Sequence, residues 1–329
     1  MPVKNVVEAP LIFPYTPHPI VETSSVPLDG LDDQSLTGHD IMPILKILQP
    51  GDEILLENFL LQHINTSMFL RSNWREAGLV DQGARFQGTY VAAIANTSIV
   101  AVAAHYWNGM LVVQAPMYLN EVVQSVVAQS NRAIQGIAGP AAQVEITKEV
   151  LRLVNRPTQL NESEILFSLQ LSNLKLPTAL ASGEVECRLP YPEEFELLSQ
   201  WCVAYNIETL GQSDTPDLWS TCRQEIKARQ ASARHWVLIV EDTPIAYTAF
   251  NACLPDIVQI GGVWTPPVLR GRGYAKCVVA GSLLAARSHG VERAILFTNQ
   301  ANQAAQTAYR GIGFHPTGEE FGLVIFENH

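Results

Sequence analysis

The stretch Val263-Trp-Thr-Pro-Pro-Val-Leu-Arg270-Gly-Arg-Gly273-Tyr-Ala275 is an apolar strand that runs into a glycine-rich turn and then into an amphipathic helix. Gly271 and Gly273 keep side chains away from the turn, so a ligand can approach its backbone closely. The amides at the start of the helix point to one place and favour negative charge. Arg270 and Arg272 add positive charge there. The stretch therefore predicts a site for a phosphate or pyrophosphate group.

Two common phosphate-binding motifs do not fit this turn. A dinucleotide-binding loop has three glycines, as GxGxxG, and directly follows an early strand. The turn at Arg270 to Ala275 instead lies late in the chain, after a predicted hairpin, and lacks the third glycine. The P-loop pattern GxxxxGK[ST] is absent from the sequence. A glycine-rich connection with two solvated arginines is the purely structural alternative, so the turn alone leaves its ligand open.

A second motif lies one predicted helix and one predicted strand further along the chain. Between Phe297 and Phe314, a strand runs into a loop with two asparagines, and the next helix carries Tyr309 before a Gly-Phe exit. Together the two motifs resemble the GCN5-related N-acetyltransferase (GNAT) family. The acyl-CoA signature of that family, Arg/Gln-x-x-Gly-x-Gly/Ala, is matched by Arg270-Gly-Arg-Gly273-Tyr-Ala275. In the order of elements, the resemblance extends over Glu184 to Phe326.

The resemblance implies acetyl-CoA as a cosubstrate, and no metal. The backbone amides of Leu269 to Ala275 would bind the pyrophosphate, and the pantetheine arm would run beside Val263 to Thr265. Asn302 would contact the pantetheine or stabilise its loop. Tyr309 would be the general acid, because a phenol with a pKa near ~10 is protonated at neutral pH; its alternative is an aromatic side chain packed in the core. The implied cofactor-binding residues are Val263, Trp264, Thr265, Leu269, Arg270, Gly271, Arg272, Gly273, Tyr274, Ala275 and Asn302.

Acyl transfer to an ammonium also requires a general base, which takes a proton directly or through water. We select Glu208, which we expect in the loop from Tyr205 to Gly211 between two helices, where a GNAT fold would border the acceptor site. Asp256, in a turn before a strand, is a second candidate. Both also fit solvated loop carboxylates.

The two halves of the chain have the same order of predicted elements, from periodicity and turn residues. In the second half we predict strands at Glu184–Leu189, His235–Val240, Ile245–Phe250, Ile257–Trp264, Ala294–Thr298 and Gly322–Phe326, and helices at Glu193–Tyr205, Asp217–Arg229, Gly273–Ser288 and Asn302–Arg310. In the first half we predict helices at Asp40–Leu48, Asp52–His63, Thr66–Glu76, Leu119–Gln129 and Ala141–Leu151, and strands at Gln87–Ile94, Ile99–Tyr106, Met110–Gln114, Ala133–Ile137 and Ile165–Leu169.

This repeated order predicts an α/β protein with a mixed sheet, of the α+β kind, built from two tandem GNAT-like acyl-CoA N-acyltransferase domains at residues 1–176 and 183–329. The linker would be Lys175-Leu-Pro-Thr-Ala-Leu-Ala-Ser-Gly183. The N-terminal domain is degenerate, because Ala115-Pro-Met-Tyr-Leu-Asn120 replaces the phosphate turn without glycine or arginine. We expect it to cover the acceptor cleft or to form an oligomer interface. Aromatic side chains that could line such a cleft, or pack in the core, are Phe69, Trp74, Tyr106 and Trp107.

Composition narrows the class of protein. The 329 residues carry a formal net charge of −11 and no Lys/Arg run, which argues against nucleic acid as a partner. We expect no membrane span and, from the Pro-rich stretch Met1 to Thr23, no signal peptide. The five cysteines lack zinc or disulfide spacing, so we expect free thiols in a reducing cytoplasm.

The function that these patterns favour is acetyl transfer from acetyl-CoA to a primary amine of a small molecule or peptide. A non-catalytic acyl-CoA-binding or sensor protein is the alternative, because no base is unambiguous. An assembly scaffold is a third. The sequence leaves the acceptor and a homo-oligomeric state open, since fold does not imply substrate.

Overall fold

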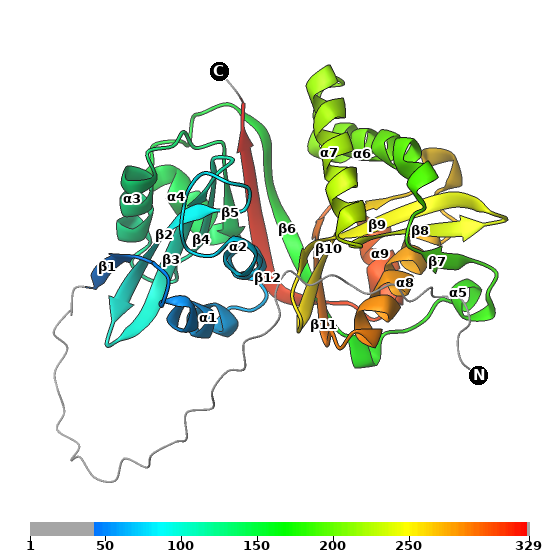
Figure 1. The fold of residues 1–329 in the computed structure, drawn as a ribbon, viewed down its shortest axis with the longest axis horizontal. Coiled ribbons are helices and arrows are strands. Elements are labelled where there is room, and N and C mark those ends of the chain that lie inside the picture. The colour runs from blue at the N-terminus through cyan, green and yellow to red at the C-terminus, as the bar shows by residue number, and fades with distance from the viewer. Residues whose placement is uncertain (1–42, 328–329) are drawn as a thin grey trace, which may run out of the picture.

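The computed structural model describes residues 43–327, which form two halves with the predicted repeat of elements (Figure 1). The N-terminal half contains β1 (Ile44–Ile47), α1 (Glu53–Gln62), α2 (Met68–Ala77), β2 (Gly88–Ala95), β3 (Ser98–Tyr106), β4 (Met110–Gln114), α3 (Leu119–Ser130), β5 (Gly136–Pro140), α4 (Ala141–Val150) and β6 (Thr158–Gln170). The C-terminal half contains α5 (Thr178–Ser182), β7 (Glu186–Arg188), α6 (Phe195–Leu210), α7 (Pro216–Ala231), β8 (His235–Val240), β9 (Thr243–Cys253), β10 (Ile257–Trp264), α8 (Tyr274–Ser288), β11 (Arg293–Asn299), α9 (Gln303–Gly311) and β12 (His315–Phe326).

The two halves share one mixed sheet because each places its last strand in the other. The strand order is β1-β2-β3-β4-β5-β12-β6-β11-β10-β9-β8-β7. Strand β6, from the N-terminal half, pairs antiparallel with β11, and β12, from the C-terminal half, pairs antiparallel with β5. The two exchanged strands lie side by side at the centre of the molecule (Figure 1). Side chains of β6 therefore enter the C-terminal half.

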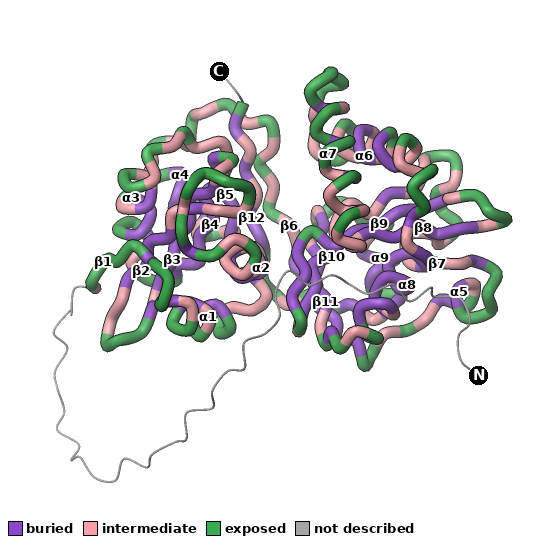
Figure 2. Tube along the Cα trace, in the orientation of Figure 1, coloured by how far each residue is buried: buried purple, intermediate pink, exposed green. Residues whose placement is uncertain are grey.

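Helices cover both faces of the sheet in each half. In the N-terminal half, α3 packs on β2 and β3, while α1 and α2 cover the opposite face. In the C-terminal half, α8 packs on β7 to β10, and α6 and α7 cover the other face. Buried residues follow the strands of both halves (Figure 2). Helix α2 crosses the border, since its Met68 is buried against Leu166, Ile257 and Ile295.

Most predicted elements are present, and the differences have tertiary causes. Residues 44–47 form the edge strand β1 instead of a helix, because they pair antiparallel with β2. Strand β5 lies later than predicted, where it pairs with β4 and β12. The predicted linker contains the helix α5, whose Leu180 is fully buried in the C-terminal core. The start of the predicted helix at Asp40 and the predicted absence of a signal peptide at Met1 to Thr23 lie outside the described residues.

Candidate functional site

Strands β10 and β11 run parallel but part at their C-terminal ends. Their pairing ends where Ile260 lies opposite Leu296. Both strands continue beyond that point, to Trp264 and to Asn299. The register of β10 against β9 shifts in the same segment, and Gly262 there has a φ of 60°, which favours glycine. The separated strand ends leave a gap beside backbone groups that an extended ligand can pair with.

The predicted phosphate turn lies at the end of β10. After a 3₁₀ turn at Pro267–Leu269, Gly271 and Gly273 adopt φ values of 79° and 80°, in the left-handed region that favours glycine. Helix α8 begins directly afterwards, and Gly273 has no side chain with which to cap its first amides. A Cβ added at Gly271 would meet no atom within 4 Å. The turn thus combines helix N-terminal amides with space beside them, which suits a pyrophosphate.

Arg270 of this turn is bound to Glu208. Its guanidinium donates two hydrogen bonds to the carboxylate of Glu208, at 2.7 and 2.9 Å, and a third to the carbonyl of Thr265 at 2.9 Å. The guanidinium carbon lies 4.9 Å from the centre of the Trp264 ring. Glu208 is in the last turn of α6 and not in a loop as predicted, because the helix continues to Leu210. The pair ties α6 to the turn; a role for Glu208 as base stays a prediction.

Tyr309, the predicted general acid, lies on α9 and is 7% exposed. Its ring packs edge-on against Phe314, with 6.1 Å between the ring centres. Burial, together with the nearby Tyr205 and Glu164, raises the pKa of Tyr309 above its usual value. The phenol is therefore protonated at neutral pH, as an acid must be before it donates. Tyr309 does not itself line the cavity described below, whereas Tyr205 does.

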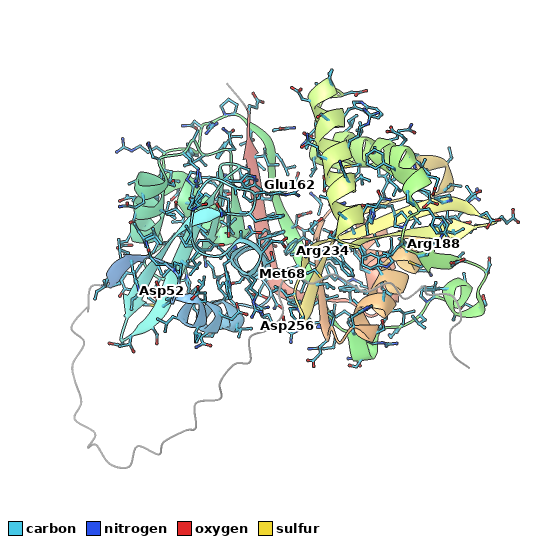
Figure 3. The ribbon with its side chains drawn as sticks, viewed as in Figure 1. Asp52, Met68, Glu162, Arg188, Arg234 and Asp256 are labelled. Atoms are coloured by element: carbon cyan, nitrogen blue, oxygen red, sulfur yellow. The ribbon has the colours of Figure 1, made fainter. Side chains whose placement is uncertain are left out.

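Two other candidates have structural partners. The side chain of Asn302 caps α9, since its Oδ1 accepts a hydrogen bond from the backbone amide of Ala305 at 3.0 Å. That contact fits the prediction that Asn302 stabilises its loop. Asp256 forms an ion pair of 3.1 Å with Arg71, a buried residue of α2. Asp256 lies on the border between the halves (Figure 3), where it helps to hold α2 against the C-terminal half.

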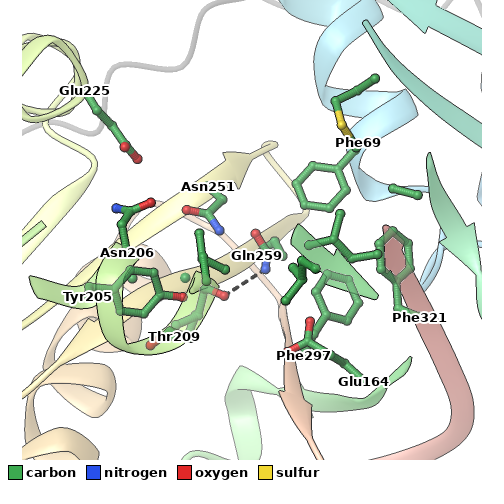
Figure 4. Close-up of a pocket in the computed structure, with 18 of the residues that line it drawn as sticks. Phe69, Glu164, Tyr205, Asn206, Thr209, Glu225, Asn251, Gln259, Phe297 and Phe321 are labelled. Atoms are coloured by element: carbon green, nitrogen blue, oxygen red, sulfur yellow. Dashed lines mark hydrogen bonds between the residues drawn. The ribbon is translucent and has the colours of Figure 1, made fainter. Parts of the chain in front are cut away.

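A cavity of about 510 Å³ lies between the halves and reaches the gap between β10 and β11 (Figure 4). The C-terminal half contributes Tyr205, Asn206, Gly261, Gly262 and Trp264. The N-terminal half contributes Phe69, Phe86, Tyr106 and Trp107, and the exchanged strands contribute Glu162, Glu164 and Phe321. Of the four aromatic residues named from the sequence, Trp74 does not line the cavity; its indole donates to Glu57 at 3.2 Å. Both halves therefore build one cavity.

Two carboxylates of β6 face this cavity, and sequence reasoning missed both. Residues two apart on a strand share a face, and Glu162 and Glu164 both line the cavity. Asn299 of β11 donates a hydrogen bond to Glu162. Burial, followed by repulsion from Glu162, raises the pKa of Glu164 to about 7. The alternation in Leu160-Asn-Glu162-Ser-Glu164 was a usable signal for a shared face, but nothing local shows that β6 enters the other half.

Arg229 of α7 is the one cationic side chain that lines the cavity among the described residues. Its guanidinium lies 2.5 Å from the carboxylate of Glu225. It also donates to the hydroxyl of Tyr247 and to the side-chain oxygen of Asn251, each at 3.0 Å. These three partners occupy the guanidinium, so Arg229 has little capacity left for an anionic ligand.

The corresponding turn of the N-terminal half also joins a strand to a helix, but it is made of different residues. It joins β4 to α3 through Ala115, Pro116, Met117 and Tyr118. Its first amide, of Ala115, donates to the side chain of Gln143 at 2.6 Å.

Between residues 43 and 327 there is no cluster of three metal-ligating side chains, and no helix is long and apolar enough to cross a membrane.

Known proteins provide independent evidence for this fold. A sequence model of the acetyltransferase (GNAT) family matches residues 200–314. No curated protein matches the chain. A Drosophila protein of known structure is similar with a TM-score of 0.61 and 13% identity, over 87% of this chain and 100% of that one.

The similar solved structures include two that are named as members of the family. A GCN5-related N-acetyltransferase from Sphaerobacter thermophilus has a TM-score of 0.53 and 14% identity, over 87% of this chain and 96% of that one. A tandem GNAT protein from the clavulanic acid biosynthesis pathway has a TM-score of 0.50 and 11% identity, over 87% and 99%. At these identities the likeness concerns the fold. Residues 200–314 thus match a domain of the acetyltransferase (GNAT) family, and the chain as a whole has the mixed α/β fold of GNAT proteins, tandem ones included.

Proposed function

We propose that this protein moves an acetyl group from acetyl-CoA to a primary amine by direct transfer. One observation carries the proposal. The glycine turn at Arg270 to Ala275 adjoins the gap between β10 and β11, and this gap opens into the cavity along Gly261 and Gly262. A donor that starts at the turn and follows β10 would present its thioester to the cavity.

In this proposal the amides of Leu269 to Ala275 bind the pyrophosphate, and the backbone of Val263 to Thr265 lies beside the pantetheine. Tyr309 protonates the leaving thiolate, since its phenol is protonated at neutral pH. Glu208 positions Arg270 at the turn through its two hydrogen bonds.

We propose further that residues 1–176 and 183–329 are the two domains, with the N-terminal one serving the acceptor side. Phe69 and Trp107 of that domain line the cavity, in support of this division of roles.

The five cysteines are free and buried, which supports a reducing compartment such as the cytoplasm.

Release of CoA, measured with a panel of primary amines, tests the proposal. We expect Tyr309→Phe to lower kcat roughly 100-fold while acetyl-CoA still raises the melting temperature. Binding of acetyl-CoA without CoA release for any amine would instead indicate an acyl-CoA-binding protein or sensor. A melting temperature that acetyl-CoA does not change would contradict the assignment of the turn.

A further inference from the structure

The cavity between the halves carries an excess of negative charge. Three carboxylates line it, those of Glu162, Glu164 and Glu225, against the single cation of Arg229. Glu225 is neutralised by Arg229 at 2.5 Å. Neither Glu162 nor Glu164 forms an ion pair with any residue in the range 43–327 that the structure describes. A cationic ligand would supply the missing partner in a medium that strengthens the attraction.

A cluster of aromatic rings lies next to these carboxylates. The rings of Phe297 and Phe321 are stacked, with 4.4 Å between their centres. The ring of Phe69 lies 6.2 and 5.9 Å from them. In the sheet, Glu164 lies opposite Asn299 of β11 and Phe321 of β12, so its carboxylate adjoins the ring cluster (Figure 4).

We infer that this cavity is the acceptor site and that it takes a primary amine with an aromatic or otherwise apolar body, whose ammonium lies at Glu162 and Glu164. The inference rests on the acetyl transfer proposed above. The body would pack against Phe69, Phe297 and Phe321, where its burial is favourable. A polyamine or an amino sugar fits this position poorly, because the rings of Phe69, Phe297 and Phe321 offer no hydrogen-bond partner to a further charge or hydroxyl packed against them.

The same arrangement makes Glu164 the general base, a catalytic residue supplied by the N-terminal half. Glu164 accepts one proton from the ammonium, and the neutral amine attacks the thioester carbonyl. A C–N bond forms, the C–S bond breaks, and its electron pair stays on the sulfur. Tyr309 protonates that thiolate and recovers a proton from the nitrogen of the new amide. The proton on Glu164 leaves to solvent, so the turnover yields amide, CoA thiol and one proton.

Several charged or titratable groups surround Glu164. Glu162 lies on the same strand, Tyr205 on α6 and Tyr309 on α9. Glu225 and Arg229 face the cavity from α7. Since a base must be ionised and the pKa of Glu164 is about 7, the rate should rise with pH through about 7.

Turnover of chosen amines by the full chain tests the acceptor class. We expect kcat/KM for 2-phenylethylamine to exceed that for ethylamine and for spermidine by at least about tenfold. In the absence of acetyl-CoA, 2-phenylethylamine should raise the melting temperature, whereas its neutral analogue 2-phenylethanol should not. A preference for spermidine or ethylamine, with CoA still released, would overturn the inference and leave the acetyl transfer intact. If 2-phenylethylamine binds but no amine releases CoA, the binding site stands and the proposed function fails.

A pair of variants tests the base. Glu164→Gln should lower kcat roughly 100-fold and abolish the rise in rate through about pH 7. Its matched control is Glu320→Gln on β12, because Glu320 is exposed, bonds to Ser163 and does not line the cavity. The control should keep the wild-type rate and pH profile. A Glu164→Gln protein with wild-type kcat and an unchanged pH profile would overturn the assignment.

Discussion

Helices α8 and α3 begin in the same way but present different surfaces. Each follows the central strand of its half, and each is preceded by one residue in the left-handed region. Before α8 this residue is Gly273, with a φ of 80°; before α3 it is Tyr118, with a φ of 51°. Both helices therefore start from a left-handed residue, in which a tyrosine is strained, but the connection before α8 (Thr265–Gly273) is longer than the one before α3 (Ala115–Tyr118).

What differs is access to the backbone. Before α8, Gly271 has open space where a side chain would stand, a Cβ at Gly273 would meet only the Lys276 side chain, at 3.0 Å, and Arg270 is paired with Glu208. The turn before α3 carries Pro116 and Met117 instead, and the side chain of Met117 is exposed. The two helices therefore begin with the same backbone conformation but differ in the side chains beside their first amides. We expect only the C-terminal half to bind acetyl-CoA.

Exchange of the residue before each helix should have the largest effect. Gly273→Tyr should weaken acetyl-CoA binding by about 100-fold, because the side chain covers the helix amides and the left-handed conformation costs about 1–2 kcal/mol. Tyr118→Gly, the reciprocal change, should leave the affinity unaltered. Calorimetric titration of both variants with acetyl-CoA measures this, and equal losses in the two would show that the halves do not differ as described.

The sequence predicts the conformation of the turn and three aromatic side chains of the cavity, but not the carboxylates of the cavity. Strands β4, β8 and β10 have the predicted bounds, because alternation and turn residues are local signals. The requirement for glycine at Gly271 and Gly273 can also be inferred from the neighbouring sequence alone. The carboxylates of Glu162 and Glu164 reach the C-terminal half only through the exchange of β6 and β12. Pairing between distant strands depends on the whole sheet, which no local pattern reveals.

The strand exchange should also make the free energy of unfolding depend on pH, because it buries Glu164. Burial raises the pKa of Glu164 from 4.5 to about 7, so this group favours folding most below pH 4.5 and loses that contribution as pH rises through about 7. At pH 8, Glu164→Gln should therefore be more stable than the wild type by about 2 kcal/mol, allowing for partial exposure. At pH 4 the difference should vanish. Thermal unfolding at both pH values measures it, with Glu320→Gln as control; a variant less stable at pH 8 would contradict the assigned burial.

The pair of Arg270 and Glu208 has no counterpart at the N-terminal turn, where no arginine stands. If Glu208 positions Arg270, Glu208→Ala should raise KM for acetyl-CoA by about fivefold and leave kcat within about twofold, because an exposed pair contributes little. If Glu208 is instead the base, kcat should fall roughly 100-fold. Steady-state kinetics with saturating amine distinguish these outcomes.

The smallest effect should come from the cap of α9. Asn302 caps this helix with its side chain, whereas Pro140 at the start of α4 makes no such bond. Asn302→Ala should lower the free energy of unfolding by about 1 kcal/mol. Asn302→Asp, which can still accept the bond from Ala305, should restore most of it. A loss of acetyl-CoA affinity in both variants without a change in stability would point to a direct contact with the pantetheine instead.

The central claim is that the turn before α8 binds acetyl-CoA and the turn before α3 does not. Isothermal titration of the wild-type chain with acetyl-CoA tests it most directly, through the number of sites per chain. The contrast between Gly273 and Tyr118 predicts one site, which Gly273→Tyr removes and Tyr118→Gly leaves in place. Two sites per chain, or one that survives Gly273→Tyr and disappears in Tyr118→Gly, would contradict it.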